Sequence, residues 1–185
     1  MRPFAFIVVP LLLAAVSCSP TAGTGPRTGT TGGSPPPPCH PGCFPAGTAI
    51  VTPEGSRPVE SIRPGDVITL VGSNGQTIRE SVESIYQTSN TLVEVRTESG
   101  NLLTTTTQPL CLESGELRPA GKLVAGDRIW RWEGDQRRST VVREVGATGR
   151  EAAVFNLVVG ESAVFIANGF LARGKPPLFA GGASE

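Results

Sequence analysis

Two cysteines and the chain's single histidine fall within the stretch CHPGC, residues 39–43. A thiol can serve as a nucleophile, a metal ligand or half of a disulfide, depending on its surroundings. Cys43 is followed by the turn-rich stretch FPAGT, so it is either a nucleophile at the first position of a domain or a small buried residue beside a turn. A structural zinc site needs four ligands, and if Cys18 is set aside for the lipid anchor described below, Cys111 is the only further thiol beyond Cys39, His40 and Cys43. We therefore expect no metal and no cofactor.

The start of the chain has the features of an export signal. Arg2 precedes an apolar run from Phe4 to Val16, which is too short to span a bilayer as a helix but fits a secretory signal peptide. Small residues precede Cys18, as in bacterial lipoproteins, where signal removal leaves a lipidated cysteine. We expect an exported lipoprotein of the bacterial cell envelope, with the membrane as its partner through Cys18. The alternative is a soluble secreted protein cut near Ser17.

The other cysteines leave the disulfide pairing open. Lipidation of Cys18 would leave three thiols in an oxidising compartment, so one stays free if the other two pair. A bridge from Cys39 to Cys43 would close a tight loop and mask Cys43 until reduction uncovered it. A bridge from Cys39 to Cys111 is the alternative.

The elements that must position Cys43 begin where the composition changes. Residues 18–42 are mostly Gly, Thr, Ser and Pro, and they bury too little apolar surface to offset the entropy of ordering. From residue 43 onward, short β-branched runs alternate with Gly, Asn and Asp turns, and helical periodicity is absent. We therefore predict a signal peptide over 1–17, a disordered tether over 18–42, an all-β domain of antiparallel strands over 43–173 and a flexible tail over 174–185.

The charge balance limits the range of partners. Acidic and basic residues number 16 each, which gives no electrostatic case for binding nucleic acid. We expect a monomer without a nucleic-acid partner. The sequence does not identify a protein partner.

A weak internal repeat runs through the predicted domain. SIRPGDVITL (61–70) is similar to KLVAGDRIWR (122–131), and TIRESVESI (77–85) and TVVREVGA (140–147) follow at nearly the same offset. Gly-Asp is a common turn dipeptide, so one match would carry little weight. Two matches in the same order predict a duplicated half-domain.

The stretch CFPAGTAIVTPEGSRPVESIRPGDVI (43–68) resembles the opening of the Hint domain, the family of hedgehog autoprocessing domains, inteins and bacterial intein-like proteins. Three later segments resemble the rest of that domain in the same order: LLTTTTQPL (102–110), GELRPAGKLVAGDRI (115–129) and VFNLVVGESAVFIANGFLARG (154–174). The resemblance implies an all-β horseshoe of antiparallel strands with a pseudo-two-fold internal duplication.

The resemblance also implies a self-modification chemistry. In this family the first thiol attacks the preceding carbonyl and converts that peptide bond to a thioester. Here Cys43 would attack the carbonyl of Gly42, and Thr105 would help to hold the scissile amide. Gln108 occupies the position of the family's proton-donating histidine. A glutamine can orient a group by hydrogen bonding, but it cannot transfer a proton near neutral pH.

Two more positions depart from the family pattern. Asn156 stands where the family often has an aspartate, and Ala172-Arg173 stands where its terminal His-Asn falls. The resemblance therefore implies no full splicing and at most a single-turnover cleavage at the Gly42–Cys43 bond, with no conventional enzyme activity. The alternative is a catalytically degenerate Hint fold that serves as a displayed structural or binding module.

Overall fold

The computed structural model describes residues 42–160 and 163–175. The predicted signal peptide, Cys18, Cys39, nearly all of the predicted tether and the last ten residues lie outside this part of the chain. Within it, the structure consists of strands and two single 3-10 turns, and no helix is long and apolar enough to cross a membrane. The predicted all-β class is confirmed.

The described part of the chain forms thirteen strands. In order, the elements are β1 (Phe44–Pro45), β2 (Ala49–Thr52), β3 (Gly55–Pro58), η1 (Val59–Ser61), β4 (Val67–Val71), β5 (Thr77–Ser81), β6 (Ser84–Thr97), β7 (Gly100–Thr105), β8 (Pro109–Cys111), β9 (Leu117–Pro119), η2 (Ala120–Lys122), β10 (Arg128–Glu133), β11 (Gln136–Val158), β12 (Val164–Ala167) and β13 (Phe170–Arg173).

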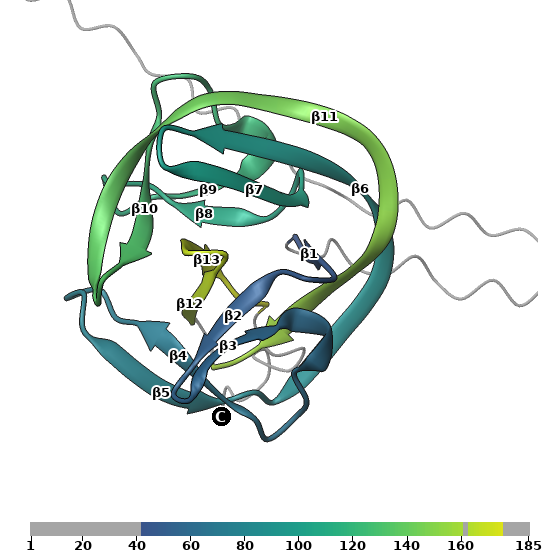
Figure 1. The fold of residues 1–185 in the computed structure, drawn as a ribbon, viewed down its shortest axis with the longest axis vertical. Coiled ribbons are helices and arrows are strands. Elements are labelled where there is room, and N and C mark those ends of the chain that lie inside the picture. The colour runs from purple at the N-terminus through teal and green to yellow at the C-terminus, as the bar shows by residue number, and fades with distance from the viewer. Residues whose placement is uncertain (1–41, 161–162, 176–185) are drawn as a thin grey trace, which may run out of the picture. The chain divides into compact units, whose positions relative to one another are not determined.

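The two longest strands, β6 and β11, pair antiparallel and curve around one side of the domain (Figure 1). The pairing shifts register twice, between Val142 and Glu144 and between Ala147 and Glu151. Such bulges bend a strand and increase its twist, which accounts for the curvature of this pair. The β12–β13 hairpin lies inside the curve, and β2 pairs with β12 while β8 pairs with β13.

The internal repeat is present in the backbone contacts. The carboxylates of Asp66 and Asp127 each accept a hydrogen bond of 2.8 Å from the backbone N–H three residues earlier. The glycine before each aspartate has a positive φ, 90° at Gly65 and 96° at Gly126, a conformation that glycine adopts without steric cost. The two Gly-Asp turns are therefore built the same way.

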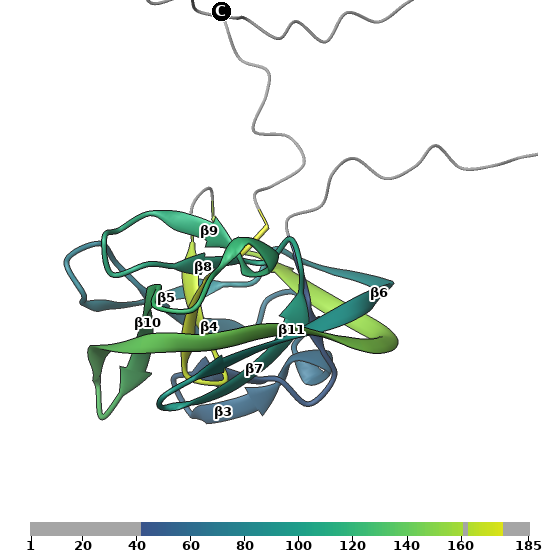
Figure 2. The same cartoon turned by 90° about the horizontal axis from the view of Figure 1, so that it is seen from above.

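The two halves also meet the central hairpin in equivalent ways. Ile50 of β2 pairs with Ala167 of β12, and Leu110 of β8 pairs with Ala172 of β13. In Figure 2, where the domain is seen from above, this hairpin (yellow) runs across it. Each half thus attaches to one strand of the same hairpin, which confirms the predicted pseudo-two-fold duplication.

The short strand β1 is fixed by the core. Phe44 is completely buried, pairs with Phe155 of β11 and meets the ring of Phe165 edge-to-face, with the ring centroids 5.9 Å apart. Burial of a phenylalanine side chain contributes roughly 2–3 kcal/mol. This anchor holds Cys43, one residue earlier, in a defined position beside β11.

Candidate active site

The peptide bond between Gly42 and Cys43 is held by hydrogen bonds on both sides. The Asn156 side-chain nitrogen donates to the Gly42 carbonyl oxygen, and the Cys43 N–H donates to Thr105 Oγ1 at 2.8 Å. Asn156, Thr105 and Gly42 are all buried. The structure therefore brings together Gly42, Cys43 and Thr105, the three residues that the family motif places around the bond.

The orientation of the Asn156 amide is fixed by a second contact. Its Oδ1 accepts a 2.7 Å hydrogen bond from the Leu157 N–H, so its Nδ2 faces the Gly42 oxygen. A preorganised donor at a carbonyl oxygen stabilises the negative charge that forms when a nucleophile attacks the carbon. An ionised aspartate has no proton to donate there. The departure from the family pattern at this position therefore adds a donor at the Gly42 carbonyl, which the sequence analysis does not predict.

The carbonyl of Cys43 is held as firmly as the carbonyl before it. Thr104 Oγ1 donates to this oxygen at 2.8 Å, and the Thr105 N–H donates to it at 3.1 Å. Thr104 and Thr105 end β7 and are both fully buried. Thr104 belongs to the TTTT run of the sequence, but which threonines of that run point inward depends on the register of β7. The two threonines fix the backbone of Cys43 on both sides of its Cα.

Gln108 lies directly against Gly42. A Cβ built on Gly42 would come within 1.9 Å of Gln108 Cα, so only glycine fits at this position. The Gln108 side chain is fully buried, and its Nε2 donates to the carbonyls of Arg173 at 2.9 Å and Pro109 at 3.1 Å. Gln108 thus lies beside the Gly42–Cys43 bond, but its amide donates to backbone carbonyls and has no proton to transfer near neutral pH.

The Cys43 thiol is protonated at neutral pH. Its side chain is almost wholly buried, and this loss of solvation raises the pKa of the thiol to about 11. The positive charge of Lys175 acts in the opposite direction and lowers that pKa. Because the thiolate is the nucleophilic form of a cysteine, Cys43 could act as a nucleophile only if another group removed its proton.

Lys175 falls in the predicted tail, but in the structure it bridges to Val158 of β11. Only 5 % of it is exposed, its N–H donates to the Leu157 carbonyl at 2.9 Å, and its Nζ lies 4.0 Å from the centroid of the Tyr86 ring. Burial lowers the pKa of Lys175, and the proximity of Cys43 raises it in part. No spacing or periodicity in the sequence indicates this contact.

A cavity of about 350 Å³ lies against both residues of the Gly42–Cys43 bond. The rest of its lining consists of Thr105, Thr107 and four residues of β6: Tyr86, Thr88, Ser89 and Asn90.

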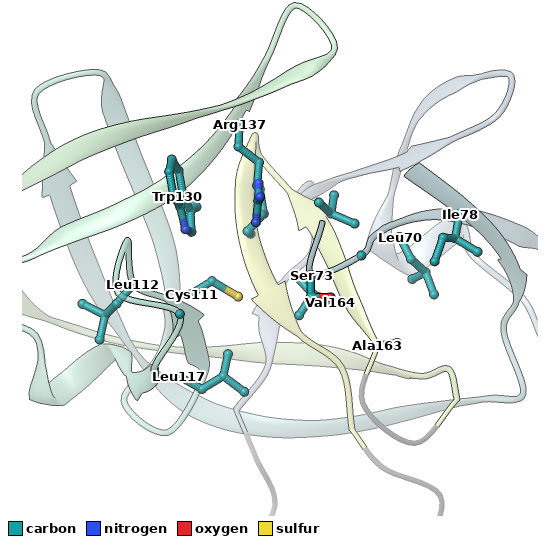
Figure 3. A pocket seen from close by; sticks show the side chains of 14 residues that line it. Leu70, Ser73, Ile78, Cys111, Leu112, Leu117, Trp130, Arg137, Ala163 and Val164 are labelled. Carbon is teal, nitrogen blue, oxygen red and sulfur yellow. The ribbon is translucent and has the colours of Figure 1, made fainter. Parts of the chain in front are cut away.

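Cys111 lines a different pocket from Cys43. It lines an apolar pocket of about 380 Å³ together with Leu117, Trp130 and Arg137, and its sulfur points into the pocket (Figure 3). Burial raises its pKa to about 12. Cys43 and Cys111 are both free thiols, while Cys39 lies outside the described residues, so its pairing stays a prediction. Within residues 42–160 and 163–175, no three potential ligands cluster as a metal site would require.

Comparison with known families and structures agrees with this architecture. The Hint domain family matches residues 42–174. No curated protein matches the chain.

Solved structures of inteins and intein-like domains share the fold. The bacterial intein-like domain from Clostridium thermocellum is 22% identical, with a TM-score of 0.60, and the match covers 71% of this chain and 97% of that one. The DnaB intein from Synechocystis sp. PCC 6803 is 14% identical, with a TM-score of 0.65, over 72% of this chain and 98% of that one. The Ssp DnaB mini-intein variant M86 is 14% identical, with a TM-score of 0.66, over 75% of this chain and 96% of that one.

Proposed function

The chain belongs to the Hint domain family, and from that membership we propose that it cleaves itself once, at the Gly42–Cys43 bond. The observation that carries this proposal is the pair of hydrogen bonds across the bond. Asn156 donates to the carbonyl oxygen of Gly42, and Thr105 accepts from the amide nitrogen of Cys43. These are the two atoms whose charge changes most when a thiol displaces an amide.

The proposed reaction proceeds in two stages. The Cys43 sulfur loses its proton and attacks the Gly42 carbon, and Asn156 stabilises the oxyanion that forms. The carbon–nitrogen bond then breaks, the Cys43 nitrogen takes up a proton, and Gly42 is left joined to the sulfur as a thioester. Water in the adjacent cavity hydrolyses the thioester, which restores the thiol and releases an N-terminal segment ending in the Gly42 carboxylate.

The closing strands do not carry the groups for splicing. Ala172 pairs with Leu110 inside the sheet, and Arg173 follows it at the end of β13. Neither side chain can attack its own backbone as an asparagine amide does. The proposed activity therefore ends with N-terminal scission.

Time-resolved intact mass spectrometry of the full chain in detergent tests this proposal. Incubation with dithiothreitol is expected to release the segment that ends at Gly42, whereas Cys43→Ala remains intact. Cys111→Ala is the matched thiol control and is expected to cleave at the wild-type rate. A wild-type chain that stays whole after prolonged reducing incubation would show that the proposal is wrong.

We also propose that the released segment is a lipid-anchored tether. The apolar N-terminal run, the small residues before Cys18 and the Gly/Thr/Pro-rich stretch after it support this. Palmitate labelling in cells is expected for the wild-type chain and absent for Cys18→Ser. Equal labelling of the two would contradict the anchor.

A second candidate function is a Hint fold displayed as a structural or binding module without turnover. The observation in its favour is Gln108, which stands against Gly42 where the family has its proton donor. This function predicts an intact Gly42–Cys43 bond under all reducing conditions, so the same mass measurement separates the two.

A further inference from the structure

We propose that Lys175 carries the proton in this reaction, taking it from the Cys43 sulfur and returning it to the Cys43 nitrogen. This inference rests on the proposed self-cleavage and deepens it. It assigns a role to a buried cation that the cleavage steps above leave unused.

The first support is the position of Lys175 along β11. One edge of β11 is occupied by β6, which pairs with it as far as Val158. Phe44 pairs with Phe155, and Lys175 bridges to Val158 in the parallel sense, so both use the other edge of β11. Gly42 and Cys43 therefore approach the same short stretch of β11 as Lys175, with Asn156 between them.

The second support is the environment of the ammonium group. Lys175 Nζ lies over the face of the Tyr86 ring, and the same ring packs against the small cluster that contains Cys43. An aromatic face stabilises a cation that has lost its water. Lysine side chains are almost never fully buried unless a partner stabilises them. The Tyr86 face is one such partner for Lys175, and the positive charge is near enough to lower the pKa of the Cys43 thiol.

The third support is that the side chains held against the Gly42–Cys43 bond itself have no proton-transfer capacity. Asn156, Thr105 and Gln108 surround the bond, and none of the three gains or loses a proton near neutral pH. Lys175 and Cys43 interact electrostatically with one another, each shifting the pKa of the other. A lysine whose pKa is lowered by burial can act as a base nearer to neutral pH than an exposed one.

The proton balance of the step is complete. Neutral Lys175 takes the proton from Sγ as the sulfur–carbon bond forms. The resulting ammonium donates it to the Cys43 nitrogen as the carbon–nitrogen bond breaks. Lys175 ends neutral, as it began, and no additional reactant is consumed. Among the ionisable residues near it in the fold, Tyr86 presents its ring to the ammonium, Arg173 ends β13 two residues earlier, and the Glu83 N–H donates to the carbonyl of Val158, the residue to which Lys175 bridges.

The chain provides its own matched control, because it contains only two lysines and Lys122 is exposed. Scission rates of the full chain are compared for wild type, Lys175→Arg, Lys175→Met and Lys122→Met. Arginine keeps a positive charge but does not give up its proton in this pH range. We expect both Lys175 variants to cleave on the order of 100-fold more slowly or worse, and Lys122→Met to match wild type. Melting temperatures show whether each variant is folded.

The pH profile separates proton transfer from a structural role. The wild-type rate is expected to rise with pH as Lys175 loses its proton. Any residual rate of Lys175→Arg should rise only at higher pH, where the thiol itself ionises. If Lys175→Arg cleaves at the wild-type rate with the wild-type profile, a positive charge is sufficient and the proton-transfer role is wrong.

A second readout does not depend on cleavage. Alkylation of Cys43 by iodoacetamide reports how readily the thiol ionises. Near neutral pH, Lys175→Arg should react at about the wild-type rate, whereas Lys175→Met should react several-fold more slowly because the nearby cation is gone. If wild type does not cleave at all, the proposed function fails by itself. Alkylation then decides the inference: slower reaction of Lys175→Met supports the pairing of Lys175 with Cys43, and an unchanged rate overturns it.

Discussion

The described residues include two buried free thiols, Cys43 and Cys111, each near a positive charge, and they differ in whether a peptide carbonyl is held beside the sulfur. Cys43 follows a peptide carbonyl that accepts a hydrogen bond from Asn156, and the positive charge of Lys175 lowers the pKa of the Cys43 thiol. Cys111 lies among apolar side chains in a pocket with Trp130 and Arg137. Burial raises the pKa of both thiols, so neither is a thiolate at neutral pH.

From this comparison we infer that a difference in reactivity between the two thiols would come from their surroundings and not from the thiols themselves. Each cysteine taken alone is a protonated, buried group. What distinguishes Cys43 is a held carbonyl, a donor for the oxyanion and a nearby amine. Removing any one of these features should lower the rate at which Cys43 attacks the Gly42 carbonyl.

The largest effect is expected from Gly42→Ala. The new methyl group would overlap Gln108 Cα, so the carbonyl must leave the hydrogen bond from Asn156. Scission should become undetectable by intact mass, while the melting temperature stays close to wild type because Gly42 precedes β1. Gly146→Ala, whose added Cβ would have only Glu144 Oε1 nearby, at 3.8 Å, is the matched control and should cleave normally. Normal scission in Gly42→Ala would contradict the described packing.

Asn156→Asp should have the next largest effect. An ionised carboxylate at this position repels the oxyanion, and loss of one such donor typically lowers the rate about 100- to 1,000-fold. Asn74→Asp, in an exposed turn, controls for the change of charge. The measurement is the single-turnover rate by mass spectrometry, and an unchanged rate would remove Asn156 from the mechanism.

Gln108→His should raise the rate. A histidine against Gly42 could donate a proton to the departing nitrogen, and a positioned acid–base group typically contributes about 100-fold or more. Its contribution should decline above the histidine pKa, which gives the variant a pH profile unlike that of wild type. If the rate does not change, the alignment of Gln108 with the family histidine is of no consequence for catalysis.

The smallest effect concerns a property that the two thiols share. Their pKa values in the folded chain are about 11 for Cys43 and about 12 for Cys111, against 9.0 for the unperturbed group. The unfolded chain therefore binds fewer protons above pH 9, so the stabilisation is fully present below that pH and is lost as the pH rises toward the folded values.

Replacing either thiol should reduce this alkaline loss. Between about pH 7.5 and pH 10.5, Cys43→Ala and Cys111→Ala should each lose about 1–2 kcal/mol less unfolding free energy than wild type. Chemical denaturation at the two pH values measures this difference. Identical losses in all three proteins would show that these thiols do not carry the alkaline sensitivity.

The sequence predicted the fold and part of the site, for identifiable reasons. The Gly-Asp turns at Asp66 and Asp127 depend only on neighbouring residues, so the sequence alone predicts that they repeat. The structure shows the same hydrogen bond in both turns. The contact between Cys43 and Thr105 could be predicted because both residues match motifs of the Hint domain, in the same order along the chain.

The remaining site residues depend on pairings between distant strands. The sequence shows Asn156 only as a departure from the family's aspartate, because its contact with Gly42 depends on the register of β1 against β11. The sequence predicts Lys175 in the tail, because its bridge to Val158 is a single parallel contact without a periodic signal. No local pattern encodes either contact.

The central claim is that Cys43 forms a thioester with Gly42, and hydroxylamine tests it most directly. Hydroxylamine cleaves thioesters near neutral pH and leaves ordinary peptide bonds intact, so fragment mass spectrometry can identify the product. We expect wild type and Cys111→Ala to release an N-terminal segment ending in a glycine hydroxamate at Gly42, and Cys43→Ala to release none. No hydroxamate from the wild-type chain, or an equal amount from Cys43→Ala, would contradict the thioester.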